Sequence, residues 1–269
     1  MLRMLIIDFP AVTHSTEASA VQVLRFEMAI YCVTGANRGL GLEFVRQLAV
    51  NKDNIILATV RNNAADLADL KAVASPSTHV LVCDVGSPDT IRSFASEAAR
   101  LLEKQGGRRI DYLLNVAGVN YAPELGSLSI NQDALNTNMR INVVGPAKVV
   151  EFLLEKDLLS PKVRILNMTS GLGSMTKSLA IKPRKCAVYS ISKAGVNMLT
   201  VHQSEDLKAK LPSVVVITVD PGWVKTRMGG EGAEIEPRES ISGMLNIIHG
   251  VSGEDNGKFF NYNGSEQPW

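Results

Sequence analysis

The sequence predicts an α/β fold, a doubly wound parallel sheet of about seven strands with helices on both faces, on two observations. Short runs rich in Val, Ile and Leu alternate along the chain with longer segments in which apolar residues recur at helical spacing. The first apolar run also leads into a glycine-rich turn that opens a helix. Such near-continuous apolar strands are typical of a parallel sheet that is covered on both faces.

The expected elements follow one another without an internal repeat, a low-complexity tract or a linker. The predicted strands are Ile30–Thr34, Ile55–Val60, His79–Cys83, Tyr112–Asn115, Val163–Met168, Val214–Val219 and Lys258–Asn261. The predicted helices are Gly39–Val50, Ala64–Val73, Pro88–Lys104, Gln132–Asp157, Val188–Leu211 and Arg238–Gly250. We therefore interpret residues 28–269 as one domain. We interpret residues 1–27 as a poorly ordered or loosely packed N-terminal extension, with Met28 as an alternative start.

Composition narrows the classes of protein to consider. The chain has 269 residues, of which 45% are apolar and 20% charged, and its net charge of +1 suggests neither a nucleic-acid partner nor an anionic membrane. No apolar run reaches the roughly 18 to 20 residues that span a bilayer. Three cysteines without metal-ligand spacing argue against a disulfide framework and favour a reducing, cytoplasmic location. The four histidines show no metal-ligand spacing, so we expect no metal site.

A phosphate-binding turn is predicted where the first strand meets the first helix. The GxxxGxG motif after Thr34 comprises Gly35, Asn37, Arg38, Gly39, Leu40 and Gly41. Glycines let the backbone approach a pyrophosphate, whose negative charge is then stabilised at the helix N-terminus. The alternative is an ordinary tight turn, but the position between a strand and a helix favours a dinucleotide site. The sequence thus predicts a single-domain Rossmann-type fold.

Charge near the second strand favours NADP(H) over NAD(H). An NAD site places a carboxylate about twenty residues beyond the glycine turn, whereas this chain has Arg61 after its second strand. We expect Arg38 and Arg61 to bind a 2′-phosphate through charge-assisted hydrogen bonds. The alternative is that both are solvated surface arginines. Asp84, at the end of the third strand, is placed to contact the adenine or, alternatively, to cap the next helix.

Three side chains form the candidate catalytic group. Tyr189 and Lys193 share one helix face because they are four residues apart. Ser170 follows a strand and so lies at the carboxyl edge of the sheet, where ligands bind in open α/β folds. The ordinary pKa of tyrosine is too high for proton exchange near neutrality, and a cationic Lys193 together with an oxidised nicotinamide ring would lower it. We expect Tyr189 to be the acid–base residue, Ser170 to hold the substrate oxygen and Lys193 also to bind the nicotinamide ribose.

Further motifs follow the same order along the chain. They are Asp84-Val85, Asn115-Val116-Ala117-Gly118, Asn142-Val143-Val144-Gly145 and Pro221-Gly222-Trp223-Val224-Lys225-Thr226. With these motifs the chain resembles the short-chain dehydrogenase/reductase family from about Ala29 to its last residue, and residues 257–269 are similar to the branch of C-signal-like and sniffer-type carbonyl reductases. Three departures are Val116, where a second asparagine is common, Arg227, where an acid is frequent, and a separation between Ser170 and Tyr189 that is longer than in many relatives.

The resemblance implies an NADP(H)-dependent carbonyl reductase or alcohol dehydrogenase that transfers hydride between nicotinamide C4 and a carbonyl or alcohol carbon. It implies a catalytic tetrad of Asn142, Ser170, Tyr189 and Lys193, in which Asn142 holds a water of the proton relay. It adds cofactor-binding residues to those above, namely Val85, Asn115, Ala117, Gly118, Pro221, Gly222, Val224 and Thr226. Asn115 would also steady the central strands. A homodimer or homotetramer would form through helices 132–157 and 188–211.

The sequence also allows two alternative functions, and it contains a basic segment and a cysteine close to Tyr189. The first alternative is a catalytically silent nucleotide-binding sensor or signalling protein. A second is an epimerase or dehydratase, which is disfavoured because its usual GxxGxxG turn and larger C-terminal domain are missing. We interpret the basic segment with Lys177, Lys182, Arg184 and Lys185 as a solvated loop rather than an attractor of acidic substrates. Cys186 is interpreted as a small buried hydrophobe rather than a redox-sensitive thiol.

The substrate pocket is expected between two loops, Gly171–Ala187 and Gly222–Glu236, and the substrate itself stays open. Gly229, Gly230 and Gly232 in the second loop favour a flexible lid over a plain connection.

Overall fold

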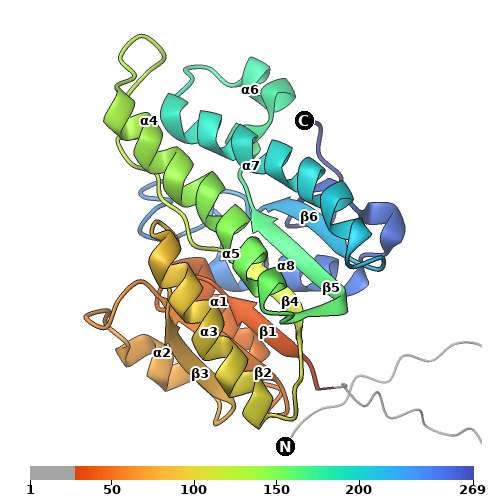
Figure 1. Cartoon of the computed structure of the whole chain (residues 1–269). Helices are drawn as coiled ribbons and strands as arrows, with labels where there is room; N and C mark the ends of the chain where they lie inside the picture. Colours follow the sequence, from red (N-terminus) through yellow and green to blue (C-terminus); the bar gives the residue numbers. More distant parts are fainter. Residues whose placement is uncertain (1–27) are drawn as a thin grey trace, which may run out of the picture.

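The computed structural model describes residues 28–269, which form one seven-stranded parallel sheet in the order β3-β2-β1-β4-β5-β6-β7 (Figure 1). The strands are β1 (Ile30–Val33), β2 (Ile55–Val60), β3 (Thr78–Val82), β4 (Ile110–Asn115), β5 (Leu159–Met168), β6 (Val215–Asp220) and β7 (Phe259–Asn261). The predicted fold class is therefore confirmed. The interpretation of residues 1–27 as an extension lies outside the described residues.

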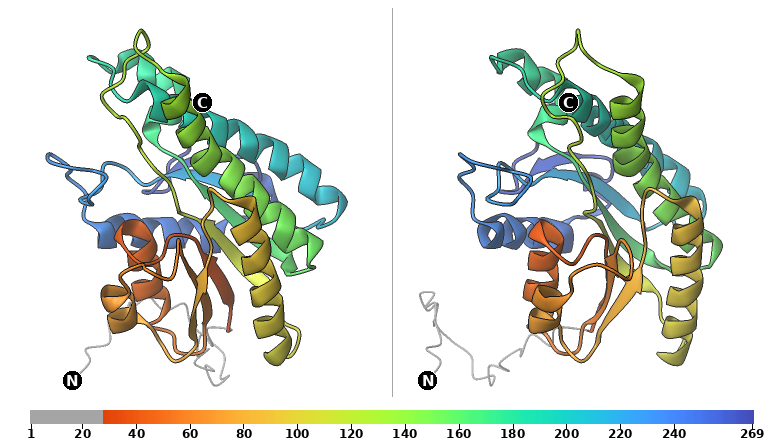
Figure 2. Two further views of the ribbon diagram at one scale, coloured as in Figure 1. Left: turned by 60° about the vertical axis from the view of Figure 1, so that its left-hand side comes forward. Right: turned by 90° about the vertical axis from the view of Figure 1, so that its left-hand side faces the viewer.

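Helices cover both faces of the sheet, as Figure 2 shows in its right-hand view. The α-helices are α1 (Gly39–Leu48), α2 (Ala68–Val73), α3 (Pro88–Lys104), α4 (Gln132–Met139), α5 (Gly145–Glu155), α6 (Met175–Ala180), α7 (Ala187–Asp206) and α8 (Pro237–Gly250). One core packs α3, α5 and the 3-10 turn that follows α7 against the sheet. The opposite core packs α1, α2 and α8 against the other face.

The central strands are mostly apolar because both of their faces are covered. Every residue of β1, β2 and β6 is buried. Phe94 of α3 and Phe44 of α1 fill the two opposite cores, and each has no exposed surface. Burial of one such ring stabilises the fold by about 2 kcal/mol. The alternation of apolar runs and amphipathic helices thus follows directly from the three-layer architecture.

The strand order reverses beside β1, which pairs with β2 on one side and with β4 on the other. At such a reversal the loops that leave neighbouring strands diverge to opposite faces of the sheet and open a crevice at the carboxyl edge. The glycine turn after β1 and the segment after β4 both lie at this edge. The topology therefore places the candidate cofactor residues at the position where open α/β sheets bind ligands.

Several predicted element boundaries are wrong. The helix expected over Gln132–Asp157 is interrupted by a π-helical turn at Arg140–Val144. The loop expected after Ser170 contains α6, and β5 begins at Leu159, before the predicted Val163. The helix expected at Ala64 begins at Ala68, and the one expected to reach Leu211 ends at Asp206 before a 3-10 turn. No helix of the described part is long and apolar enough to cross a membrane.

Candidate active site

The glycine turn has the geometry that the motif predicts. Gly35 and Gly39 have φ of 70° and 55°, a left-handed conformation that glycine adopts without steric cost. A Cβ on Gly41 would lie 2.3 Å from the carbonyl oxygen of Gly35, so α1 begins directly against the turn. The close approach leaves no room for a side chain at this position. Because these positions carry no side chain, a phosphate can approach the backbone of the turn.

Two threonines hold the turn against the sheet. The Thr34 hydroxyl accepts hydrogen bonds from the backbone N–H groups of Val116 (2.9 Å) and Ala117 (3.0 Å). On the other side, the N–H of Ala36 donates to the carbonyl oxygen of Thr59 at 2.8 Å. A Cβ on Gly35 would meet Ala117 at 3.1 Å. The carboxyl ends of β1, β2 and β4 are thus joined around the glycine turn.

The N-terminus of α1 is open to a ligand. Arg38 occupies the N-cap position, and its side chain makes no capping hydrogen bond. Asn37 does not cap the helix either, since its amide donates to the carbonyl oxygen of Asp66 at 3.3 Å. The first turn, which includes Gly39 and Leu40, therefore offers backbone N–H groups and the positive end of the helix dipole to an anion.

Three arginines from separate segments gather beside this turn. The positive charges of Arg227 and Arg61, after the larger effect of partial burial, lower the pKa of Arg38. None of the three forms an ion pair within residues 28–269. Neighbouring cations without a carboxylate partner repel one another and favour a bound anion. The sequence predicted Arg38 and Arg61, but it offered Arg227 only as a departure from the family pattern.

Asp84 and Val85 lie at the end of β3. The carboxylate of Asp84 accepts a hydrogen bond from the backbone N–H of Gly86 at 2.9 Å. The N-cap of α3 is Ser87, so the alternative in which Asp84 caps this helix is wrong. A Cβ on Gly145 would lie 2.7 Å from the carbonyl oxygen of Val85, which brings this loop against the start of α5. Contact of Asp84 with the adenine stays a prediction.

Asn115 joins the two central strands after the sheet reverses. Its amide nitrogen donates to the Asn167 side chain on β5 at 2.9 Å, and Asn167 donates in turn to Thr200 of α7 at 3.0 Å. Asn115 is buried, and its side-chain oxygen has no partner among the described residues. This position is consistent with the role of steadying the strands, whereas a direct contact with the cofactor stays a prediction.

Tyr189, Lys193 and Ser170 lie together. Tyr189 and Lys193 project from the first turns of α7, and the Lys193 nitrogen lies 5.5 Å from the centre of the Tyr189 ring. Ser170, the residue at which β5 passes into a short 3-10 turn, lies close enough to the Tyr189 side chain to lower its pKa. Lys193 is held in place by donating to the Met168 carbonyl oxygen at 2.7 Å. The structure thus brings together the three side chains that the sequence singled out.

Burial shifts the protonation equilibria of this group. Burial, followed by the negative charge of Asp220, raises the pKa of Tyr189, while the nearby Ser170 side chain lowers that pKa. Burial also lowers the pKa of Lys193 to about 8. Burial in a water-poor site disfavours the charged form of both residues, and the decrease expected for Tyr189 beside an oxidised nicotinamide ring stays a prediction. A positively charged ligand ring beside Tyr189 would counter the effect of burial.

Asn142 lies in the π-helical turn and is 1% exposed. Its side-chain oxygen accepts from the N–H of Val119 at 2.8 Å, while its nitrogen donates to the Val119 carbonyl oxygen at 2.8 Å and to the Ser192 hydroxyl at 2.9 Å. A Cβ on Gly118 would lie 3.1 Å from the Asn142 oxygen and 3.6 Å from the Lys193 nitrogen. Asn142 therefore positions the backbone beside Lys193, and its water-holding role stays a prediction.

The segment after β6 closes the site from the other side. Gly222 has φ of 76°, and Val224 is buried and bridges to Ile235. The Thr226 hydroxyl accepts from the N–H of Gly229 at 3.1 Å, and a Cβ on Gly39 would lie 3.9 Å from the Thr226 methyl group. The segment Pro221–Thr226 thus reaches back to the glycine turn. Movement of residues 229–232 as a lid stays a prediction.

Comparison with known proteins identifies the family. A sequence model described as short chain dehydrogenase matches residues 29–236. The chain belongs to the short chain dehydrogenase family. C-signal of Myxococcus xanthus is 34% identical over 161 residues, which cover 60% of this chain and 93% of that protein. The NADPH-bound carbonyl reductase from chicken fatty liver is 28% identical with a TM-score of 0.79, covering 90% of this chain and 99% of that one. Carbonyl reductase Sniffer of D. melanogaster is 26% identical with a TM-score of 0.79, covering 90% and 100%.

The resemblance to the C-signal-like and sniffer-type branch is therefore confirmed, as is membership of an oxidoreductase family. Two features of the structure differ from the interpretation of the sequence. Lys177, interpreted as part of a solvated loop, is only partly exposed and forms an ion pair with Asp220, a residue that the sequence analysis missed. Cys186 is partly rather than fully buried, and its sulfur accepts from Asn120 at 3.6 Å. Within residues 28–269 no group of acidic, Cys and His side chains is arranged to hold a metal ion.

Proposed function

We propose that the chain is an NADP(H)-dependent carbonyl reductase or alcohol dehydrogenase that acts on a small-molecule carbonyl or alcohol. The observation that carries the proposal is the convergence of Ser170, Tyr189 and Lys193 at the carboxyl edge of the sheet, beside the segment that reaches the glycine turn. Structural neighbours that include an NADPH-bound carbonyl reductase support the reaction class.

The residues present fit NADP(H). The narrow turn at Gly35 and Gly41 admits a pyrophosphate, and the uncapped N-terminus of α1 stabilises its charge. Arg38 and Arg61, joined by Arg227, suit the further charge of a 2′-phosphate. When bound, the cofactor supplies or accepts the hydride at nicotinamide C4. Pro221, Gly222, Val224 and Thr226 would line its nicotinamide end.

In the reductive direction the side chains act on the substrate oxygen. The Ser170 hydroxyl donates a hydrogen bond that holds this oxygen, and Tyr189 donates the proton that the oxygen takes up as hydride reaches the carbon. Lys193, as an ammonium, favours the tyrosinate that remains. Asn142 holds Gly118 and Val119 in place beside Lys193. In the oxidative direction Tyr189 takes up the proton instead.

Turnover of carbonyl compounds tests the proposal. We expect the chain to consume NADPH with at least one of benzaldehyde, acetophenone and menadione, which represent an aldehyde, a ketone and a quinone. Tyr189→Phe removes the proton donor and is expected to lower kcat by roughly a hundredfold or more, with an unchanged Kd for NADPH measured by calorimetry. Tyr31→Phe, near the start of β1 and away from the carboxyl edge of the sheet, serves as the matched control. Near-normal turnover by Tyr189→Phe would refute the role of Tyr189.

The same three carbonyl compounds distinguish the proposed reductase from the alternative function. NADPH binding without turnover of any of the three compounds would favour the nucleotide-binding sensor or signalling protein. The family membership shared with C-signal does not by itself decide between the two.

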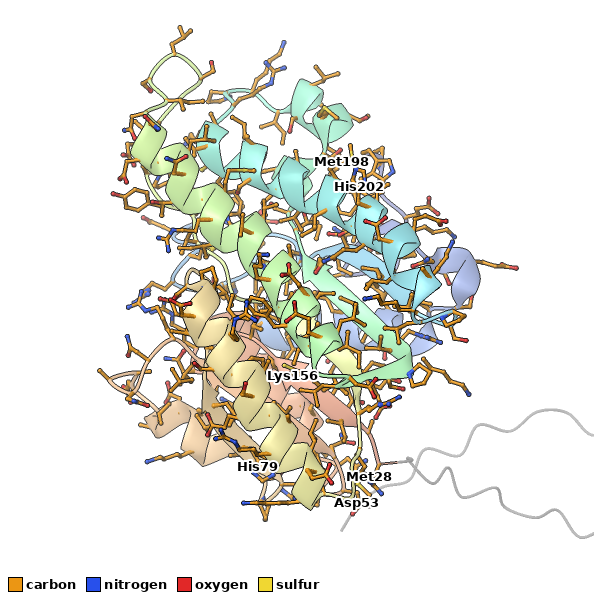
Figure 3. All side chains as sticks on the ribbon, viewed as in Figure 1. Met28, Asp53, His79, Lys156, Met198 and His202 are labelled. Atoms are coloured by element: carbon orange, nitrogen blue, oxygen red, sulfur yellow. The ribbon has the colours of Figure 1, made fainter. Side chains whose placement is uncertain are left out.

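We also propose that the chain forms a homodimer through α7 and the adjoining π-helical turn. Figure 3 shows Met198 and His202 on the outer side of α7. Ile191, Met198 and Val201 are 45%, 58% and 41% exposed, and their spacing places them on one side of the helix. The cytoplasmic location predicted from the cysteines is retained as part of the proposal, since Cys32, Cys83 and Cys186 are free thiols.

A further inference from the structure

An ion pair lies next to the candidate catalytic group. The ammonium of Lys177, on α6, is 3.7 Å from a carboxylate oxygen of Asp220, the last residue of β6. The side chain of Asp220 is 7% exposed and that of Lys177 is 36% exposed. A buried carboxylate is costly unless other groups compensate its charge. The pair therefore requires an explanation beyond that of a surface salt bridge.

Geometry places the pair directly beside Ser170. A Cβ on Gly171, the next residue, would lie 2.8 Å from the Asp220 carboxylate and 3.2 Å from the Lys177 nitrogen. Both charged groups thus pack against the backbone that carries the Ser170 hydroxyl. Ser170 precedes Gly171 directly, and both Ser170 and Asp220 lie close enough to Tyr189 to affect its pKa, so the pair is near the phenol.

Asp220 connects the segments that border the site. One carboxylate oxygen accepts from the N–H of Gly222 at 3.0 Å and so orders the turn that begins the nicotinamide segment. The other oxygen accepts from the side chain of Asn261 on β7 at 3.3 Å. Lys177 in turn donates to Gln267 at 2.7 Å. The pair therefore ties the loop after Ser170 to the nicotinamide segment and to the C-terminal segment.

We propose that Lys177 and Asp220 are a positioning pair for the proposed reaction, which hold the loop after Ser170 against the nicotinamide segment and balance the charge that Tyr189 experiences. The inference rests on the proposed function. Among the basic residues of segment 177–185, Lys177 alone pairs with a carboxylate within the described residues, and the inference gives this pair a role.

The polar and charged groups that face Tyr189 determine whether each substitution raises or lowers its pKa. Ser170 approaches from the end of β5 and Asp220 from the end of β6, while Cys186 and Lys193 belong to the N-cap and the body of α7. Asp220 disfavours a tyrosinate because both carry negative charge. Lys177 lies next to Asp220 and partly cancels this effect. Removing either member leaves the other uncompensated, and the two losses act in opposite directions.

The test is the pH dependence of NADPH-driven benzaldehyde reduction. In this direction kcat/KM falls at high pH as the coupled Tyr189–Lys193 group loses its protons. Lys177→Met leaves Asp220 uncompensated and is expected to shift this fall to higher pH by roughly half a unit to one unit. Asp220→Asn is expected to shift it to lower pH by a similar amount. The double variant is expected to lie near the wild type.

Two matched variants complete the design. Lys162→Met removes an exposed lysine of β5 outside the site and is expected to leave the profile unchanged, and Lys177→Arg retains the charge and is expected to do the same. Thermal unfolding of each variant shows whether it folds. Because Lys177 is partly exposed, its variants keep the test informative even if Asp220→Asn fails to fold.

The possible outcomes are distinct. Shifts of opposite sign support the positioning pair. A wild-type profile that neither variant displaces, even with reduced kcat, indicates a merely structural pair and overturns the inference alone. Absence of wild-type turnover on the whole carbonyl panel overturns the proposed function, and this inference with it.

Discussion

Arginine side chains give the cofactor end of the site its positive charge. Arg38 belongs to the glycine turn, Arg61 follows β2 and Arg227 follows the segment after β6, so a phosphate between them would be approached from three directions. Each charge-assisted hydrogen bond to a phosphate contributes about 1.5 to 3 kcal/mol. The choice between NADPH and NADH is therefore expected to depend on these residues rather than on the catalytic group.

Arg61→Glu tests this dependence. Removing one guanidinium and adding a negative charge is expected to raise the KM for NADPH roughly tenfold to a hundredfold. The KM for NADH is expected to change little, because NADH lacks the 2′-phosphate. The measurement is kcat/KM for both cofactors with one carbonyl substrate. Arg100→Glu, at an exposed position on α3, is the charge-matched control. An unchanged ratio of the two kcat/KM values would contradict the assignment of Arg61.

The buried Lys193 lowers the free energy of unfolding at neutral pH. Its pKa of about 8, against an ordinary value of 10.5, means that the unfolded chain binds more protons than the folded chain between these pH values. The contribution of Lys193 to stability therefore rises as pH increases through this window. Below pH 8 the folded protein carries the full cost of a buried ammonium. This cost is partly offset by the hydrogen bond to Met168.

Lys193→Met is accordingly expected to stabilise the fold while abolishing turnover. The gain in the free energy of unfolding at pH 7 is expected to be roughly 2 kcal/mol, since the pKa shift exceeds the value of one lost hydrogen bond. The gain should shrink as the pH rises above 8 and vanish only well above pH 10.5, where Lys193 is neutral in both states. Urea unfolding of both proteins across this range measures the difference, with Lys185→Met as the exposed control. A destabilised variant at pH 7 would contradict this account.

Sequence reasoning recovered the candidate residues whose motif carries their chemistry. Tyr189 and Lys193 share a helix face, and Ser170 ends a strand, so their convergence was predictable from local spacing and topology. Lys177 and Asp220 are distant in the chain and belong to no motif, and only the tertiary fold brings Lys177 of α6 next to Asp220 of β6. The rise in the pKa of Tyr189 was likewise not predictable, because burial depends on every neighbouring element.

At the level of elements, strands were predicted more reliably than interruptions of helices. The apolar spacing from α4 to α5 is nearly continuous and conceals the π-helical turn at Arg140–Val144, although Pro146, which lacks a backbone N–H, lies just after this turn in the first turn of α5. Such turns insert one residue into a helix and are frequent at functional sites. Here the turn carries Asn142 to the backbone of Val119. The irregularity that the pattern concealed is thus part of the candidate site.

The short helix α6 was missed for a different reason. Its six residues are too few for helical periodicity to be detected. It is stabilised from outside, because the Ser174 side chain accepts from the N–H of Lys177 at 3.1 Å and the N–H of Thr176 donates to the Trp269 carbonyl oxygen at 3.0 Å. These partners include residues that are far away in the sequence. Local propensity alone therefore predicts a loop.

For the whole molecule, topology explains why a chain of dispersed motifs predicts one site. The glycine turn, the segment after β4, Ser170 and the segment after β6 each follow a strand of one parallel sheet. Parallel strands place all their carboxyl ends at the same edge, so residues that follow different strands meet there. The fold and the position of the site are consequences of strand order, whereas the shape of the substrate pocket depends on loops that strand order does not determine.

The outer surface of α7 leads to the final prediction. Ile191, Met198 and Val201 expose apolar side chains along one side of the helix, and Val144 of the adjoining π-helical turn is 43% exposed. Burying such a continuous apolar surface against a second copy of the chain would remove it from water. Met198→Lys places a charge at the centre of this surface and is expected to convert the proposed dimer into a monomer in light-scattering measurements. Val50→Lys, at a 78% exposed position just beyond α1, is expected to leave the mass unchanged. A wild-type protein of monomeric mass at micromolar concentration would contradict this interface.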